Sequence, residues 1–248
     1  MFEPCVPVAI PADVRLIVSD DPLVLGDELE RTVDDEWARE QTERGVRLVN
    51  NPILSYLGFD GRAIHGRFVE YRHYIASRRR PDLFPPSVVC AMGISGFTTF
   101  ELGVVIARRS ARVTSYPNMW ELVPSGSIDR VGLREDGTLD FRAALAAELA
   151  QEVNIEVPDL AALCPYALIY DPNIRTCDIA LAWDTGMTAD ALMRRARERR
   201  VDEYQAVECV PFEALGEFVR QAGDEIIPVT HTMLEPEWLV RALDALDG

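Results

Sequence analysis

Residues 140–155 read DFRAALAAELAQEVNI, and this stretch decides the fold. It is rich in Ala, Leu, Glu and Gln, which have high helix propensity, so it predicts a helix. Asp140 is a suitable N-cap, and Asn154 tolerates the left-handed geometry in which helices often end. Pro158 cannot continue the helix.

Two carboxylates lie on one face of this predicted helix. Glu148 and Glu152 stand at positions i and i+4, so one lies above the other, with Gln151 beside them. No basic residue within the helix lies near them, so a cation is their natural counter-charge. Carboxylate oxygens suit Mg²⁺ or Mn²⁺. The competing interpretation is a solvated helix face, which is the commoner use of paired glutamates.

Strand-like segments surround the helix on both sides. Residues 120–129, WELVPSGSID, read as a strand followed by a Pro-Ser-Gly turn that lets backbone approach a ligand closely. Further strands are expected at residues 14–18, 87–97, 104–110, 164–170, 177–183 and 205–212. Further helices are expected at residues 26–40, at 188–199, from Glu213 and at 235–248. The fold class is α+β or mixed α/β.

The strand, turn and helix together resemble the Nudix box, Gx5Ex7REUxEExGU, where U is a bulky aliphatic residue. Residues 120–126, WELVPSG, are similar to the family's strand and Pro-Gly-Gly turn. Residues 147–155, AELAQEVNI, align with REUxEExGU position by position, so that Glu148 takes the Glu of the RE pair and Glu152 the second Glu of the EE pair. The resemblance covers roughly residues 87–220.

The box departs from the family pattern at several positions. Ala147 replaces the Arg that usually orients a metal-binding Glu, and Gln151 replaces the first Glu of the EE pair. An inserted GLREDG breaks the Gx5E spacing and puts Leu139 where the early Glu would stand. Three acidic residues stay open as substitutes for it: Asp129, Glu135 and Asp140.

The resemblance implies an α/β/α sandwich with a mixed central sheet. It implies a Nudix domain at residues 87–248 and an N-terminal extension at residues 1–86 that packs on it. The implied catalytic residues are Glu148, Glu152 and Gln151, with Glu148 and Glu152 holding Mg²⁺ or Mn²⁺. The candidate substrate-binding residues are Arg108, Arg109, Trp120, Ser125 and Gly126. The alternative for Arg108 and Arg109 is a surface pair that flanks a strand. The alternative for Trp120 is packing in the core.

One branch of the family looks most similar. A box that ends in Glu-Val-Asn, a long insertion before the helix and an N-terminal Tyr71-Arg72 segment resemble the enzymes that hydrolyse UDP-glucose and UDP-galactose. This implies a UDP-sugar pyrophosphatase that releases UMP and a sugar 1-phosphate. The alternatives are a nucleotide-binding module with weakened catalysis, or hydrolysis of ADP-ribose, a nucleoside triphosphate or a nucleoside natural-product intermediate.

Two further features have two interpretations each. The run at residues 78–80, RRR, suits a solvated helix end, or else a phosphate or partner contact. Asp171 and Asp178 flank a predicted turn, where a turn cap is the default and an additional site carboxylate the alternative.

Composition excludes several classes of function. A net charge of −16 disfavours nucleic-acid binding. All 25 basic residues are Arg, which excludes mechanisms that need a Lys. The five cysteines form no CxxC pair and favour reduced thiols in the cytoplasm, and no apolar run is long enough to cross a membrane. The C-terminal amphipathic helix either serves a homodimer interface or covers the chain's own core.

Overall fold

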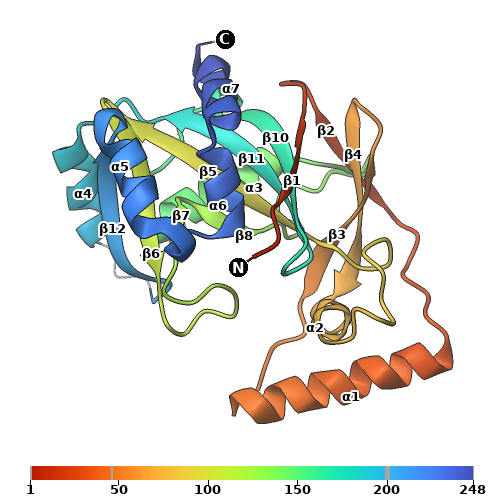
Figure 1. Cartoon of the computed structure of the whole chain (residues 1–248). Helices are drawn as coiled ribbons and strands as arrows, with labels where there is room; N and C mark the ends of the chain where they lie inside the picture. Colours follow the sequence, from red (N-terminus) through yellow and green to blue (C-terminus); the bar gives the residue numbers. More distant parts are fainter. Residues whose placement is uncertain (1, 46, 199–201, 248) are drawn as a thin grey trace.

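The computed structural model describes residues 2–45, 47–198 and 202–247. Within these ranges the chain has a mixed α+β fold, with helices on both faces of a large mixed sheet (Figure 1). The strands are β1 (Val6–Ala9), β2 (Arg15–Ser19), β3 (Pro52–Phe59), β4 (Ala63–Glu70), β5 (Ala91–Phe100), β6 (Gly103–Arg109), β7 (Trp120–Leu122), β8 (Ser125–Ser127), β9 (Thr138–Leu139), β10 (Cys164–Asp171), β11 (Thr176–Asp184) and β12 (Tyr204–Pro211). The helices are α1 (Asp27–Arg44), α2 (Tyr71–Arg79), α3 (Phe141–Glu152), α4 (Ala189–Glu198), α5 (Phe212–Ala222), α6 (Pro228–Met233) and α7 (Pro236–Leu246), with short 3-10 helices η1 (Leu160–Ala162) and η2 (Gly223–Glu225). The predicted α+β class is confirmed.

Strands β5 and β11 form the centre of the sheet. They pair in parallel, without a register shift, along the whole of β11. Every residue of β5 is buried, and so is all of β11 except its two end residues. This pattern is typical of strands covered on both faces, and it explains why most of their residues are apolar, with Asp178 of β11 as a buried exception. Strand β10 continues the sheet beyond β11, and β8 and β6 pair antiparallel with β5.

Helices bury an apolar layer on each face of this sheet. On one face, Leu145 and Leu149 of α3 and Leu192 of α4 belong to the larger core cluster. On the other face, α5, α6 and α7 enclose a second cluster that includes Trp238. Helix α7 packs on β10 and β11. The C-terminal helix therefore covers the chain's own core.

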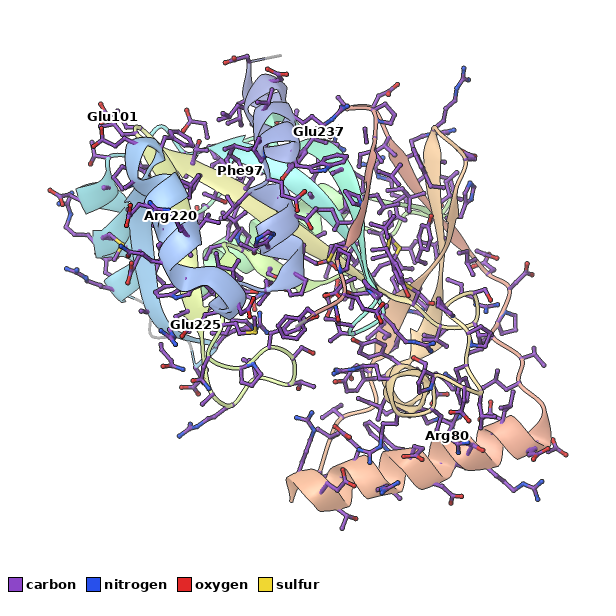
Figure 2. All side chains as sticks on the ribbon, in the orientation of Figure 1. Arg80, Phe97, Glu101, Arg220, Glu225 and Glu237 are labelled. Atoms are coloured by element: carbon purple, nitrogen blue, oxygen red, sulfur yellow. The ribbon has the colours of Figure 1, made fainter. Side chains whose placement is uncertain are left out.

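On the second face, apolar side chains lie beneath the helices and charged side chains lie on their outer surface. Phe97 of β5 is completely buried and lies behind the helices, whereas Arg220 of α5 and Glu237 of α7 lie on the outside (Figure 2). Burial of a Phe side chain contributes about 1.5–3 kcal/mol, so this second layer is a substantial part of the core.

The N-terminal region contributes strands to both ends of the sheet. Strand β1 extends the core sheet by pairing antiparallel with β10. Strands β2, β3 and β4 form the far end of the sheet, with α2 and then α1 outside them (Figure 1). The predicted strand at 14–18 and helix at 26–40 correspond to β2 and α1. Arg79 pairs with Glu36 and Glu40 of α1 at 2.7 and 2.6 Å, so this part of the arginine run joins two helices of the same chain.

Helix α3 begins and ends where the sequence predicts. The Asp140 side chain accepts a hydrogen bond from the Arg142 backbone N–H at 3.2 Å. Asn154 has φ of 57°, in the left-handed region. The structure has a strand where a Pro-Ser-Gly turn was expected. Ser125 and Gly126 belong to the short strand β8, which pairs with β5. Residue 199, the last of the predicted helix at 188–199, lies outside the described residues. Across the described ranges, no helix is both long and apolar enough to cross a bilayer.

Candidate functional site

Helix α3 holds Glu148 and Glu152 one turn apart on the face directed toward β8 and β12. Glu148 leans over Gly126 of β8, and a Cβ atom on Gly126 would overlap the Glu148 carboxyl group. A glycine at this point therefore lets the helix carboxylate reach the backbone of the strand. The Pro-Ser-Gly turn was expected to let backbone approach a ligand closely, and in the structure the close neighbour of Gly126 is the Glu148 carboxyl group.

Glu152 lies deeper than Glu148 and is only 2% exposed. Its Oε2 accepts a hydrogen bond from the Tyr204 hydroxyl of β12 at 2.7 Å. Its Oε1 is buried without a hydrogen-bond partner among the described residues. A buried carboxylate oxygen without a partner is costly, so this atom points to a ligand that a protein structure alone does not contain.

A buried ion pair stands beside these two glutamates. Glu121 of β7 is completely buried, and Arg109 Nη1 lies 2.5 Å from both of its carboxylate oxygens. Arg109 also donates from Nε to the Ser115 carbonyl at 3.2 Å. Most of this guanidinium is therefore committed to holding Glu121 and the loop between β6 and β7.

Burial, and then neighbouring negative charges, raise the pKa of the acidic groups in this region. Burial, followed by the charges of Glu203 and Asp129, raises the pKa of Glu148 to about 7. Burial and then the charge of Glu121 raise the pKa of Glu152 well above its ordinary value. Burial also raises the pKa of Glu121, against the opposing effect of Arg109. The region thus gathers carboxyl groups whose ionised forms are costly there and which a cation would stabilise.

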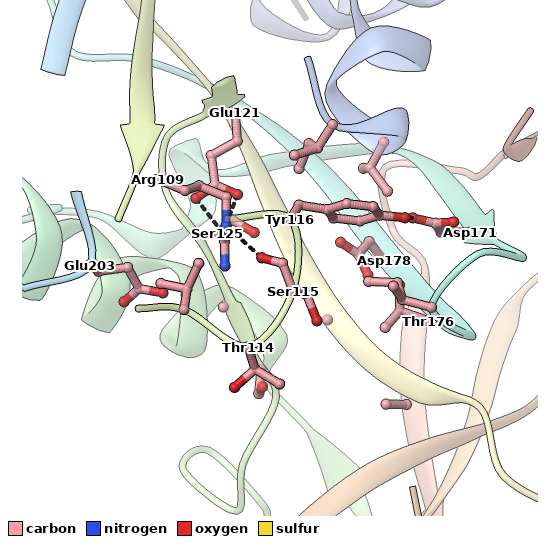
Figure 3. A pocket seen from close by; sticks show the side chains of 18 of the residues that line it. Arg109, Thr114, Ser115, Tyr116, Glu121, Ser125, Asp171, Thr176, Asp178 and Glu203 are labelled. Carbon is pink, nitrogen blue, oxygen red and sulfur yellow. Dashed lines mark hydrogen bonds and ion pairs between the residues drawn. The ribbon is translucent and has the colours of Figure 1, made fainter. Parts of the chain in front are cut away.

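A pocket of about 540 Å³ opens beside this cluster, within the size range of small-molecule sites. Its basic side chains are Arg109 and Arg112, and its acidic ones are Glu121, Asp171, Asp178, Asp202 and Glu203. Arg109, Glu121 and Glu203 lie on one side, and Asp171 and Asp178 on the other (Figure 3).

The two helix glutamates stand at the margin of this pocket. Glu148 lies against Gly126, which is part of the pocket wall, but Glu148 is not among the described residues that line the pocket. Glu152 instead lines a neighbouring hollow together with Tyr204. Arg112 and Asp202 belong to both, so the two hollows adjoin. Glu148 thus adjoins the wall of the first hollow through Gly126, and Glu152 lines the second.

Known proteins offer limited guidance. No family model matches the chain, and no curated protein matches its sequence. Among solved structures, the chain is similar to DR0079 from Deinococcus radiodurans, with 16% identity, 57% of this chain and 79% of that chain covered, and a TM-score of 0.41. It is also similar to the MutT protein from Methanosarcina mazei Go1, with 15% identity, 63% and 91% coverage, and a TM-score of 0.36.

The structure brings some of the sequence-predicted residues together and separates others. Ser125, Gly126 and Arg109 line the pocket. Arg108 and Trp120 are not among the described residues that line it. Arg108 pairs with Glu225 at 2.9 Å and lies over the Trp120 ring.

The remaining predicted positions are Gln151, Asp171 and Asp178. Gln151 is solvent-exposed on α3. Asp171 caps the turn by accepting from the Asn173 backbone N–H at 2.8 Å, and it also lines the pocket, as does Asp178.

Glu121, Tyr204, Glu203 and Arg112 were missed by sequence reasoning. Glu121 carried one signal, since a charged residue within the strand-like sequence WELV needs a partner when it is buried. The other three come from a loop and from β12 or the residue before it, and nothing in their local sequence connects them with α3. Among the described residues, no group of three or more Asp, Glu, His or Cys side chains is already arranged to hold a metal ion.

Proposed function

We propose that this chain is a Nudix-type hydrolase that cleaves the diphosphate bond of a nucleoside diphosphate sugar with the help of Mg²⁺. A UDP-sugar, cleaved to UMP and a sugar 1-phosphate, is the first candidate substrate. One observation carries the proposal: Glu148 and Glu152 stand one turn apart on α3, with Glu148 against the glycine wall of the pocket.

The chemistry of the site suits a divalent cation. The available donors are carboxylate oxygens, which Mg²⁺ and Mn²⁺ prefer, and Glu152 Oε1 is buried without a partner among the described residues. Glu148 and Glu152 are the residues that would hold the ion. When bound, the ion would neutralise charge on the diphosphate and act as a Lewis acid.

The residues of the chain have distinct tasks in such a reaction. A water oxygen forms a bond to one phosphorus atom, and the bridging oxygen leaves with the other phosphate. The water must lose a proton, and we assign a Glu148 carboxylate oxygen to accept it. Arg109 holds Glu121 in place, and Tyr204 orients Glu152 through its hydrogen bond.

A product assay tests this function. Hydrolysis would be measured on UDP-sugars, ADP-ribose and nucleoside triphosphates, with and without Mg²⁺, in ¹⁸O-labelled water. We expect Mg²⁺-dependent release of UMP and a sugar 1-phosphate from a UDP-sugar, with one labelled oxygen in one product. Absence of turnover across all of these substrates would refute the proposal.

A nucleotide-binding module with little or no catalysis is the second candidate. It is favoured by the lack, among the described residues, of a preformed group of three metal-ligating side chains, and by the exposure of Gln151. This alternative predicts that a nucleotide raises the melting temperature while no product forms.

Replacing Gly126 with Ala should impair catalysis more than folding. The new Cβ atom would overlap the Glu148 carboxyl group, which must move away from the pocket wall. We expect kcat/KM to fall by about tenfold to a hundredfold, as for other displacements of a positioned group. The matched control is Gly216→Ala in α5, where a Cβ meets nothing within 4 Å and turnover should stay at the wild-type level. Equal turnover by both variants would contradict the position assigned to Glu148.

Arg112 is the arginine that we expect to contact phosphate. It lines the pocket, it is exposed, and its guanidinium has no ion pair among the described residues. Arg112→Gln should raise KM by roughly tenfold, because a charge-assisted hydrogen bond contributes about 1.5–3 kcal/mol. Steady-state kinetics measure this effect, and an unchanged KM would remove Arg112 from the site.

A further inference from the structure

Asp178 is a buried carboxyl group on the wall of the pocket opposite Glu121 (Figure 3). It lies on β11 directly across from Gly93 of β5. A Cβ atom on Gly93 would lie 2.7 Å from Asp178 Oδ1. The glycine therefore leaves the space in which this carboxyl group lies over the neighbouring strand.

The partners of Asp178 are neutral. Its Oδ2 accepts a hydrogen bond from the Ser95 hydroxyl at 2.9 Å, and no described residue forms an ion pair with it. The titratable groups around it are the carboxyl groups of Asp171 and Glu121, the thiols of Cys5, Cys90 and Cys177, and the Tyr74 hydroxyl. Burial, then Asp171 and Glu121, raise the pKa of Asp178 to about 7, although hydrogen bonds from Ser95 and Thr176 oppose this shift.

This environment favours the hydroxyl-bearing part of a ligand over its phosphate part. An acidic wall without a counter-cation repels phosphate, so a diphosphate is disfavoured beside Asp178. A carboxyl group that can both accept and donate a hydrogen bond suits a hydroxyl group. Phosphate is better placed toward Arg112 and the carboxylates of α3, where a cation would stand.

Part of the wall of the pocket that Asp178 lines is apolar and aromatic. Ile53, Tyr71 and Tyr74 of the N-terminal region line the same pocket, as does the hydroxyl-bearing Thr176. A ring with one apolar face and hydroxyl groups at its edge matches this combination, because apolar walls with a few polar groups are typical of small-molecule sites.

We propose that Asp178, together with this aromatic wall, forms a subsite for a hydroxyl-bearing sugar ring. Asp178 is then a substrate-binding residue that determines specificity for the part of the ligand without phosphate. The inference rests on the proposed function, which places the diphosphate beside α3. The ring is either the ribose of the nucleotide or the sugar linked to it, and both present the same hydroxyl chemistry.

Binding measurements test the subsite separately from hydrolysis. Three ligands without a cleavable diphosphate bond would be titrated by calorimetry in the presence of Mg²⁺: UMP, glucose 1-phosphate and methylenediphosphonate. We expect Asp178→Ala to weaken UMP or glucose 1-phosphate about tenfold or more, which corresponds to the loss of about 1.4 kcal/mol, and to leave methylenediphosphonate unchanged. The weakened ligand identifies the source of the ring.

Matched variants exclude a general disturbance of the pocket. Asp184→Ala changes an exposed carboxylate on the same strand and should leave all three affinities unchanged. Asp178→Asn keeps a donor and an acceptor, so it should retain most of the affinity. Gly93→Ala pushes against Asp178 Oδ1 from the opposite strand and should reproduce the selective loss.

Several outcomes would overturn the subsite. They are equal weakening of all three ligands, no weakening of either ring-bearing ligand, and failure of the wild-type chain to bind either of them. A selective loss in a chain that hydrolyses none of the tested substrates would support the subsite and refute the proposed hydrolysis.

Discussion

Replacing Glu152 with Gln is expected to lower kcat for diphosphate hydrolysis by about a hundredfold or more. A bound cation contributes several kcal/mol to the transition state, and each 1.4 kcal/mol or so is about tenfold in rate. Glutamine keeps the shape and can still accept the hydrogen bond from Tyr204. Steady-state kinetics at saturating Mg²⁺ measure the change.

The matched control is Glu156→Gln, which removes an exposed carboxylate just beyond α3. We expect it to turn over at the wild-type rate. Wild-type kcat in Glu152→Gln would show that Glu152 takes no part in the chemistry.

In metal-free protein, with EDTA present, Glu152→Gln should raise stability, although it lowers kcat. The folded pKa of Glu152 lies well above its ordinary value, first because of burial and then because of Glu121. The folded state therefore binds this proton more tightly than the unfolded chain does. The free energy of unfolding falls as pH rises between the unfolded and the folded pKa. Glutamine cannot ionise, so the variant should melt at a higher temperature than wild type, and the difference should grow from mildly acidic to mildly alkaline buffer.

Replacing Arg109 with Gln is expected to lower the free energy of unfolding more than any of the substitutions described above. Glu121 is completely buried, and both of its carboxylate oxygens are paired with Nη1 of Arg109. Removal of one partner from a buried pair typically costs about 3–5 kcal/mol. For a chain of this size that corresponds to a fall in melting temperature on the order of 10 °C, which thermal unfolding followed by circular dichroism would detect.

The neighbouring arginine provides the control. Arg108 stands next to Arg109 on β6, and its pair with Glu225 is exposed. Arg108→Gln should cost about 1 kcal/mol or less. Adding Glu121→Gln to Arg109→Gln should restore much of the lost stability, because no buried charge is then left unpaired. Equal losses in the two single arginine variants would contradict the contrast drawn between them.

The helix of the candidate site could be predicted because its signals are local. The cap at Asp140, the left-handed residue at Asn154 and the shared face of Glu148 and Glu152 all follow from positions within a few residues of one another. The mainly apolar strands β5, β10 and β11 could be predicted for the same reason, since mainly apolar runs of this length suit strands covered on both faces.

The arginine pair shows where local signals stop. Arg108 and Arg109 are adjacent, and the sequence treats them alike as candidate phosphate contacts. In the fold, one lies over Trp120 near the surface and the other is paired with buried Glu121, because successive residues of a strand point to opposite faces of the sheet. Arg112, on the loop that follows, is the arginine that lines the pocket without a described ion pair.

The sequence by itself determined the α+β class, the limits of α3 and the common face of its two glutamates, because these depend on helix propensity, capping and periodicity. Only the tertiary structure decided which groups meet those glutamates. Glu121 from β7 and Tyr204 from β12 come close to them, and Asp178 from β11 faces the adjoining pocket from its other side, through strand pairing between segments far apart in the chain. Their burial, and the raised pKa of each of these side chains, arise only when that pairing removes water from around them.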